Sequence, residues 1–259
     1  MYSVSCANAG ACMAVGGGND SGTPGLIYLL SSGKWQLQPS PPLPKNFATN
    51  FDLAAVSCAD PTDCVVVGSY STSGTTQNFS SVGVIYTYKS GKWTVEQAPV
   101  PANASAFQGY SPLGLWSVDC VQATACVAGG SYEDTSGNLD PLFVTLKAGK
   151  WTPDEGPSLK SAQSPSASYV TGISCLAIDA CVADGYIFAL SGGSQPSGVL
   201  LTQTNSGWTA VASNLPSYAQ FSSGVSSPEV FGVSCVGGKL CRSAGNSGDK
   251  PLIGTLKTP

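Results

Sequence analysis

Four acidic residues are the main candidates for chemistry, because each interrupts a motif that the chain repeats five times. Asp52 and Glu229 occupy equivalent positions, four residues before the valine of a Val-Ser-Cys segment. Asp119 replaces the serine of that segment, and Asp184 replaces an apolar residue in the strand that follows. A glycoside hydrolase needs two suitably separated carboxylates, so Asp52, Asp119 and Glu229 are candidate catalytic residues. Asp119 and Asp184 could instead bond the backbone or a neighbouring serine.

Other catalytic chemistry has little support in the residue types present. The chain has no histidine, which excludes Ser-His and Cys-His triads. It also lacks the four clustered thiolate or imidazole ligands of a zinc site. A Cys-x-x-Cys redox motif is absent as well. We therefore expect no cofactor, apart from a weak calcium candidate.

The calcium candidate is a turn rich in oxygen atoms, formed by Asp134, Asn138 and Asp140 around a glycine. Calcium prefers oxygen ligands, but the regular spacing and bidentate Glu of an EF-hand are missing. A solvated turn is the simpler interpretation. Two glycosylation sequons, at Asn78 and Asn103, lie in predicted loops.

Ten cysteines form five Cys-x5-Cys pairs, always in phase with the repeat. This regularity favours local disulfides over the many other connectivities that ten cysteines allow. Disulfides indicate an oxidising compartment, so we expect a secreted or cell-surface protein. The predicted bonds are Cys6–Cys12, Cys58–Cys64, Cys120–Cys126, Cys175–Cys181 and Cys235–Cys241.

The repeat predicts the elements that must position these residues. First cysteines lie 52, 62, 55 and 60 residues apart, which is near the period typical of propellers. Each unit offers a Val-Ser-Cys strand, a strand from the second cysteine to a recurring glycine, an aliphatic strand, and a strand that begins at a tryptophan. No segment shows a capped 3.6-residue period. We predict an all-β fold: one five-bladed β-propeller of four-stranded antiparallel blades, with one disulfide per blade. The blades are approximately 1–44, 45–104, 105–160, 161–218 and 219–259.

Two further expectations concern the edges of the blades. Trp35, Trp93, Trp151 and Trp208 recur at one position and are expected to fill gaps between blades. The fifth unit ends before a fourth strand. That blade could be three-stranded, could belong to a longer protein, or could pair its free edge with another subunit.

The Ser-Gly-Lys-Trp segments lie where Asp-box propellers carry their Ser-x-Asp-x-Gly-x-x-Trp turn. The whole unit resembles repeats of secreted actinobacterial propellers, of photosystem assembly-factor propellers and of the Asp-box sialidase superfamily. The resemblance covers nearly the full chain and implies a fold, not a chemistry. Sialidases of that superfamily use three arginines, whereas Arg242 is the one arginine in this chain.

Long, variable connections are expected on one face of the propeller, where loops usually carry function. They are rich in aromatic, hydroxyl and amide side chains, which suit a neutral glycan. The same aromatic residues could instead seat their own loops. The candidate ligand-binding residues are Phe47, Phe51, Phe107, Tyr110, Tyr132, Tyr169 and Tyr218.

Composition narrows the function classes. The net charge is −4 and no basic run occurs, which argues against nucleic acid and anionic membrane partners. We expect a non-catalytic extracellular binding or adhesion module for glycan or another surface partner. The alternatives are a structural subunit of an extracellular assembly, self-associating through the last blade, and a carboxylate-based glycoside hydrolase. Enzymatic activity is the less favoured of these readings.

Overall fold

Alternation of apolar and small residues around each Val-Ser-Cys segment favours extended chain, because successive side chains of a strand point to opposite faces. The computed structural model of the chain is all-β throughout its described residues. Within those residues, no helix is long and apolar enough to cross a membrane. The described residues are 1–17, 25–39, 41–72, 80–105, 114–157, 166–189, 197–204, 206–211, 228–236, 240–247 and 250–257.

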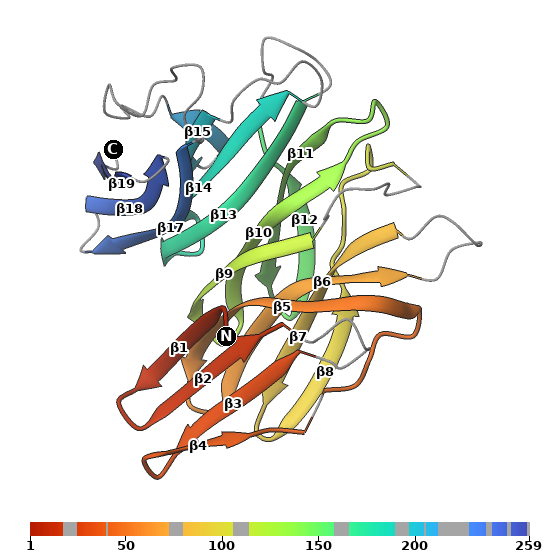
Figure 1. Cartoon of the computed structure of the whole chain (residues 1–259), viewed down its shortest axis with the longest axis vertical. Helices are drawn as coiled ribbons and strands as arrows, with labels where there is room; N and C mark the ends of the chain where they lie inside the picture. Colours follow the sequence, from red (N-terminus) through yellow and green to blue (C-terminus); the bar gives the residue numbers. More distant parts are fainter. Residues whose placement is uncertain are drawn as a thin grey trace. The chain divides into compact units, whose positions relative to one another are not determined.

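Consecutive strands pair within each Cys-x5-Cys unit, which confirms the predicted β-propeller of four-stranded antiparallel blades (Figure 1). The fifth blade has three strands among the described residues. The strands are β1 (Ser3–Asn8), β2 (Ala11–Gly16), β3 (Leu26–Ser31), β4 (Lys34–Leu37), β5 (Phe47–Asp60), β6 (Asp63–Thr72), β7 (Ser80–Lys89), β8 (Lys92–Gln97), β9 (Gly114–Gln122), β10 (Ala125–Glu133), β11 (Leu139–Lys147), β12 (Lys150–Glu155), β13 (Ser166–Ala177), β14 (Ala180–Ala189), β15 (Ser197–Thr204), β16 (Gly207–Val211), β17 (Pro228–Val236), β18 (Leu240–Ser247) and β19 (Lys250–Lys257).

The chain divides into two compact units, and each is described by itself. The first comprises residues 1–100, 106–128 and 144–153, and the second comprises 101–105, 129–143 and 154–259. In the first unit, the first strands of successive blades lie against one another, β1 against β5 and β5 against β9. In the second unit β13 lies against β17 in the same way. These blades therefore meet along their first strands, whereas the third and fourth blades are also joined by a parallel bridge, Leu139 with Ala167, between β11 and β13.

The serine of Val-Ser-Cys joins successive blades. In the first unit, Ser5 Oγ accepts a hydrogen bond from the Cys58 backbone N–H at 2.9 Å, and Ser57 Oγ accepts one from the Cys120 N–H at 3.0 Å. In the second unit, Ser174 Oγ accepts from the Cys235 N–H at 3.1 Å. The repeated serine thus has a structural role that the sequence pattern did not reveal.

Removal of one of these serine hydroxyls should weaken the contact between two blades. We expect Ser57→Ala to lower the free energy of unfolding by about 1 kcal/mol, because the Cys120 N–H loses its acceptor in a partly buried place. Urea denaturation followed by circular dichroism measures the change. Ser206, an exposed turn serine, provides a matched Ser→Ala control. An effect no larger than that of the control would contradict the role assigned to Ser57.

The sequence predicted that the second strand of each blade ends at the recurring glycine. In the later blades the strand continues beyond it. β2 does end at Gly16, but β6 continues past Gly68 to Thr72, and β14 continues past Gly185 to Ala189. A Cβ atom on Gly68 would overlap the carbonyl oxygen of Asp52, and one on Gly185 would overlap that of Tyr169. The pairing register shifts close to both places. Glycine recurs because irregular pairing brings the backbone of the neighbouring strand too close for any side chain.

All five predicted disulfides are confirmed, from Cys6–Cys12 to Cys235–Cys241. Cys6 and Cys12 face each other directly in the antiparallel ladder of β1 and β2, as do Cys235 and Cys241 in that of β17 and β18. Each bond therefore closes the short hairpin between the first two strands of its blade.

Tryptophan packing between blades is present where a preceding blade covers the side chain. Trp208 of the fourth blade stacks on Phe143 of the third, with ring centroids 3.7 Å apart and planes at 8°. Trp208 is 6% exposed, whereas Trp35, at the same position in the first blade, is 48% exposed. The predicted gap-filling role therefore holds for Trp208 but not for Trp35 in its own unit.

Candidate functional site

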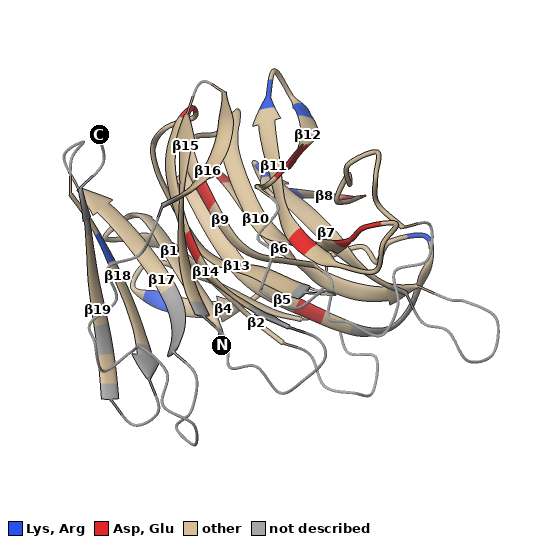
Figure 2. Ribbon diagram, turned by 90° about the horizontal axis from the view of Figure 1, so that it is seen from above, with Lys and Arg blue, Asp and Glu red and all other residues tan. Residues whose placement is uncertain are grey.

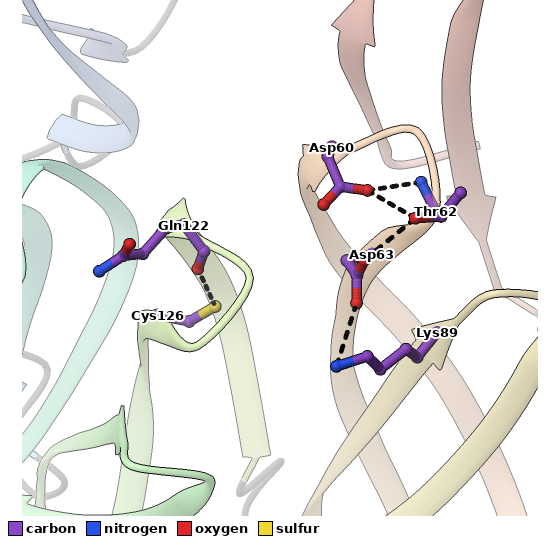
Figure 3. A network of polar contacts seen from close by, with 6 residues as sticks. All are labelled: Asp60, Thr62, Asp63, Lys89, Gln122 and Cys126. Carbon is purple, nitrogen blue, oxygen red and sulfur yellow. Dashed lines mark hydrogen bonds and ion pairs between the residues drawn. The ribbon is translucent and has the colours of Figure 1, made fainter.

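Charged residues are sparse over the described ribbon, so each carboxylate can be assessed by its own surroundings (Figure 2). The Asp60 carboxylate forms hydrogen bonds within its own turn, between β5 and β6. Its Oδ1 accepts hydrogen bonds from the Thr62 backbone N–H at 2.7 Å and from the Thr62 hydroxyl at 2.8 Å, while Lys89 lies 3.9 Å from Asp63 (Figure 3). The Thr62 N–H lowers the pKa of Asp60, which favours its ionised form. This carboxylate stabilises a turn.

Asp134, one of the predicted calcium ligands, is engaged in the same way. Its Oδ1 accepts from the N–H groups of Ser136 and Asn138, both at 2.8 Å, and its Oδ2 accepts from Asn138 Nδ2 at 3.1 Å. Burial raises the pKa of Asp134, but these bonds outweigh it and hold the pKa below its ordinary value. Asp140 is buried in β11. Among the described residues no three Asp, Glu, His or Cys side chains converge as a metal site, and calcium binding stays a prediction.

Asp52 has a different environment. It lies near the start of the first strand of its blade, and its side chain is exposed. Partial burial nevertheless raises the pKa of its carboxyl. A Cβ atom on Gly17 would lie 2.5 Å from Asp52 Oδ1 and 2.8 Å from the hydroxyl oxygen of Tyr2. The carboxyl and the phenol therefore border one small space beside a glycine, and Tyr2 is 66% exposed. Tyr2 and Gly17 could not be predicted from the sequence, because a single aromatic residue and a single glycine form no recognisable motif.

Asp52 and Asp119, two of the three acids predicted as a catalytic set, belong to the first unit and are not brought together. Asp119 is next to Cys120, and the Cys120 N–H donates a hydrogen bond to Ser57 Oγ on β5. Asp52 lies five residues before Ser57 on the same strand. At ~3.3 Å per residue, Asp52 and Asp119 lie roughly 15 Å apart. Catalytic carboxylate pairs are separated by about 5–9.5 Å. Glu229 pairs with Asn246 through its backbone in the other unit, and its side chain lies outside the described set.

The predicted aromatic face is also largely internal. Phe51, Tyr132 and Tyr169 are buried and lie at the start or in the course of strands, not in loops. Phe47 is half-buried and packs on Phe51 with ring centroids 6.0 Å apart. Phe107, Tyr110 and Tyr218 lie outside the described residues. Phe51, Tyr132 and Tyr169 therefore cannot serve as surface platforms for a glycan.

Buried tyrosines instead anchor the connections between blades. The Tyr132 hydroxyl donates to Asn103 Oδ1 at 3.1 Å, and the Tyr70 hydroxyl donates to Asn46 Oδ1 at 2.7 Å. Asn103 also donates through Nδ2 to Glu155 at 3.1 Å. The two asparagines follow equivalent proline-containing segments, so the same tyrosine–asparagine hydrogen bond occurs in two blades. The sequon asparagine Asn103 is thus part of the scaffold.

Comparison with known proteins supports the fold. No protein-family model and no curated protein matches the sequence. Among solved structures, the α-L-arabinanase of Penicillium chrysogenum complexed with arabinobiose aligns with a TM-score of 0.50 and 8% identity, covering 99% of this chain and 93% of that one. The Bacillus subtilis arabinanase Arb43A gives 0.46 and 12%, covering 96% and 91%. A Bacillus halodurans xylan β-1,4-xylosidase gives 0.47 and 10%, and this chain spans 52% of its length. At such identities the likeness establishes the fold alone.

These findings correct the functional expectation. The expected non-catalytic adhesion module, and the preference against enzymatic activity, find no counterpart in the Penicillium structure of similar fold, which is an arabinanase. The burial of Phe51, Tyr132 and Tyr169 removes most of the described aromatic face on which that expectation depended. Of the two alternatives, the structural subunit and the carboxylate-based hydrolase, the second is the one with a counterpart of similar fold.

Proposed function

We propose that the chain is a carbohydrate-active hydrolase in which Asp52 acts as the proton donor. The observation that carries the proposal is the setting of Asp52, an exposed carboxyl with a raised pKa beside the Tyr2 hydroxyl, on the row of first strands. A general acid must keep its proton at the working pH and must reach its substrate. The raised pKa of Asp52 acts in the direction of the first requirement, and its exposed side chain meets the second.

Each nearby residue has a defined part in this proposal. Asp52 protonates the oxygen of the leaving sugar. Gly17 leaves room for that carboxyl, because any side chain there would press on Asp52 and Tyr2. The proposal assigns no second carboxylate, and Asp119 lies too far from Asp52 along the strands to pair with it. The Penicillium enzyme of similar fold is an arabinanase, so arabinan is the first substrate to test, followed by xylan.

The test is turnover of arabinan and xylan, measured as released reducing sugar. We expect Asp52→Asn to reduce kcat by about a hundredfold or more, since general acids contribute roughly 10²–10⁴. Glu96→Gln is a matched control, because Glu96 is also exposed with a pKa raised by burial but lies on the outer strand β8. That control should retain wild-type activity. Asp119→Asn and Glu229→Gln, at the other two acids predicted from the sequence, are assayed in parallel.

Two results would count against the proposal. A wild-type protein that cleaves none of these polysaccharides contradicts hydrolase activity on them. A wild-type protein that cleaves one of them equally well after Asp52→Asn contradicts the role of Asp52. Loss of activity in both Asp52→Asn and Glu96→Gln would indicate a general effect of removing acids.

The proposal extends to the location of the protein and to its partner. Five disulfides support an oxidising compartment, and we propose that the protein is secreted and that its partner is a glycan. The specific likeness to Asp-box propellers and self-association through the edge of β19 stay predictions.

A further inference from the structure

Asp184 is a buried acid that the proposed reaction does not use. It lies on β14, three residues after the second cysteine of its blade, where the other blades carry Val15, Val67, Gly129 and Ala244. Its side chain is 0% exposed, and no hydrogen bond of ordinary geometry reaches either carboxyl oxygen. Buried polar groups without partners are rare in native proteins and call for an explanation.

Gly172 creates the space that the Asp184 carboxyl occupies. Gly172 pairs with Asp184 across β13 and β14. A Cβ atom on Gly172 would overlap Asp184 Oδ1, and it would lie 2.9 Å from the Gly232 Cα and 3.0 Å from the Val233 nitrogen of β17. The carboxyl is therefore held at the contact between the first strands of the fourth and fifth blades. All of these residues belong to the second unit.

The surrounding strands supply no positive charge. β13, β14, β15 and β17 contain no lysine or arginine, and their ionisable side chains besides Asp184 are Tyr169 on β13, Tyr186 on β14 and Glu229 on β17. Burial raises the pKa of Asp184 to about 7, although the Thr171 hydroxyl acts in the opposite direction. A charge in this position would be stabilised neither by water nor by a counterion.

We propose that Asp184 is a protonation-controlled latch between the fourth and fifth blades. When Asp184 is protonated, its carboxyl fits the space beside Gly172, and β17 stays packed on β13. Without its proton, the buried carboxylate favours separation of β17 from β13, because separation lets water reach the charge. The fifth blade has three strands among the described residues. Its first strand, β17, contacts β13, β14 and β15 of the fourth blade. It is therefore the blade that this latch would release.

The direction of the pH dependence follows from linkage. The pKa of Asp184 is about 7 in the closed state and near its ordinary value of 3.8 in the opened state. Between these values the closed state holds a proton that the opened state has released, so rising pH favours opening. The opening constant of β17 should increase by up to about tenfold per pH unit from pH 4 to 7 and level off above that. The stabilisation is complete below pH 4.

Hydrogen exchange of the intact protein, followed by mass spectrometry from pH 4 to 9 and corrected for intrinsic rates, measures this opening. We expect peptides from β17 to lose protection with rising pH in the wild type, and to show no such slope in Asp184→Asn. Asp179→Asn is the matched control, because Asp179 is an exposed acid in the turn between β13 and β14. It should keep the wild-type slope. If Asp184→Asn does not fold, Asp184→Ala replaces it, since alanine stands at this position in the fifth blade.

A wild-type protein without a pH slope in β17 would overturn the latch. So would a slope that persists in the folded Asp184 variant, or one that Asp179→Asn removes equally. The experiment needs no substrate, and its outcome is independent of any hydrolase activity.

Discussion

Gly185→Ala is expected to lower the free energy of unfolding by about 3 kcal/mol or more, or to prevent folding. The new Cβ atom would overlap the backbone carbonyl oxygen of Tyr169, on the strand paired with β14. A side chain could rotate away from such a clash, but a carbonyl within a ladder of hydrogen bonds cannot. The equivalent Gly68→Ala would meet the carbonyl of Asp52, and should also displace the proposed acid.

Guanidinium denaturation with the disulfides intact, followed by circular dichroism, measures both variants. Gly10→Ala is the control, because a Cβ atom there would meet only Asn8 Oδ1, at an ordinary 3.7 Å. We expect the control to change stability by less than about 1 kcal/mol. If Gly185→Ala were as stable as Gly10→Ala, the recurring glycine would not be explained by the close approach of the two strands.

Trp208→Ala is expected to cost about 3–5 kcal/mol, the usual range for removing a large buried aromatic side chain. Trp208 is 6% exposed and stacks on Phe143, which is fully buried. Truncation would therefore open a cavity between two blades and also remove the ring contact. Trp208→Phe should cost much less, since it keeps an aromatic ring and removes an indole N–H that has no partner.

Trp35→Ala is the matched control for this prediction. Trp35 occupies the same position in its blade but is 48% exposed, so we expect a loss below about 1.5 kcal/mol in the same denaturation experiment. Equal losses in the two alanine variants would show that the tryptophan stabilises its own blade and not the contact with a neighbour.

Part of the candidate site could be read from the sequence. Asp52 and Asp184 could be identified as candidate functional residues because each departs from the residue type that the repeat has at its position. Their environments were not recognisable. The setting of Asp184 depends on Gly172 in β13 and on the backbone of β17 beside it. The setting of Asp52 depends on Gly17 and Tyr2, thirty-five and fifty residues earlier. Such distant neighbours leave no local pattern.

The aromatic residues illustrate the opposite error. Phe51, Tyr132 and Tyr169 lie next to turn-forming segments, so the sequence placed them in loops. In the structure β5, β10 and β13 include them, and their rings are buried. Strand length depends on how far the neighbouring strand continues to offer hydrogen bonds, and that is a property of the pair of strands.

The sequence by itself determined the number of blades, the strand order within each blade and all five disulfides, because these depend on residues close together in the chain and on a pattern that recurs. Tertiary structure alone decided which tryptophans are covered and why the serines and glycines recur. The serine and tryptophan outcomes depend on contacts between strands separated by fifty or more residues, such as the Ser57–Cys120 bond and the Phe143–Trp208 stack. Two residues with the same place in the repeat, Trp35 and Trp208, therefore differ in burial.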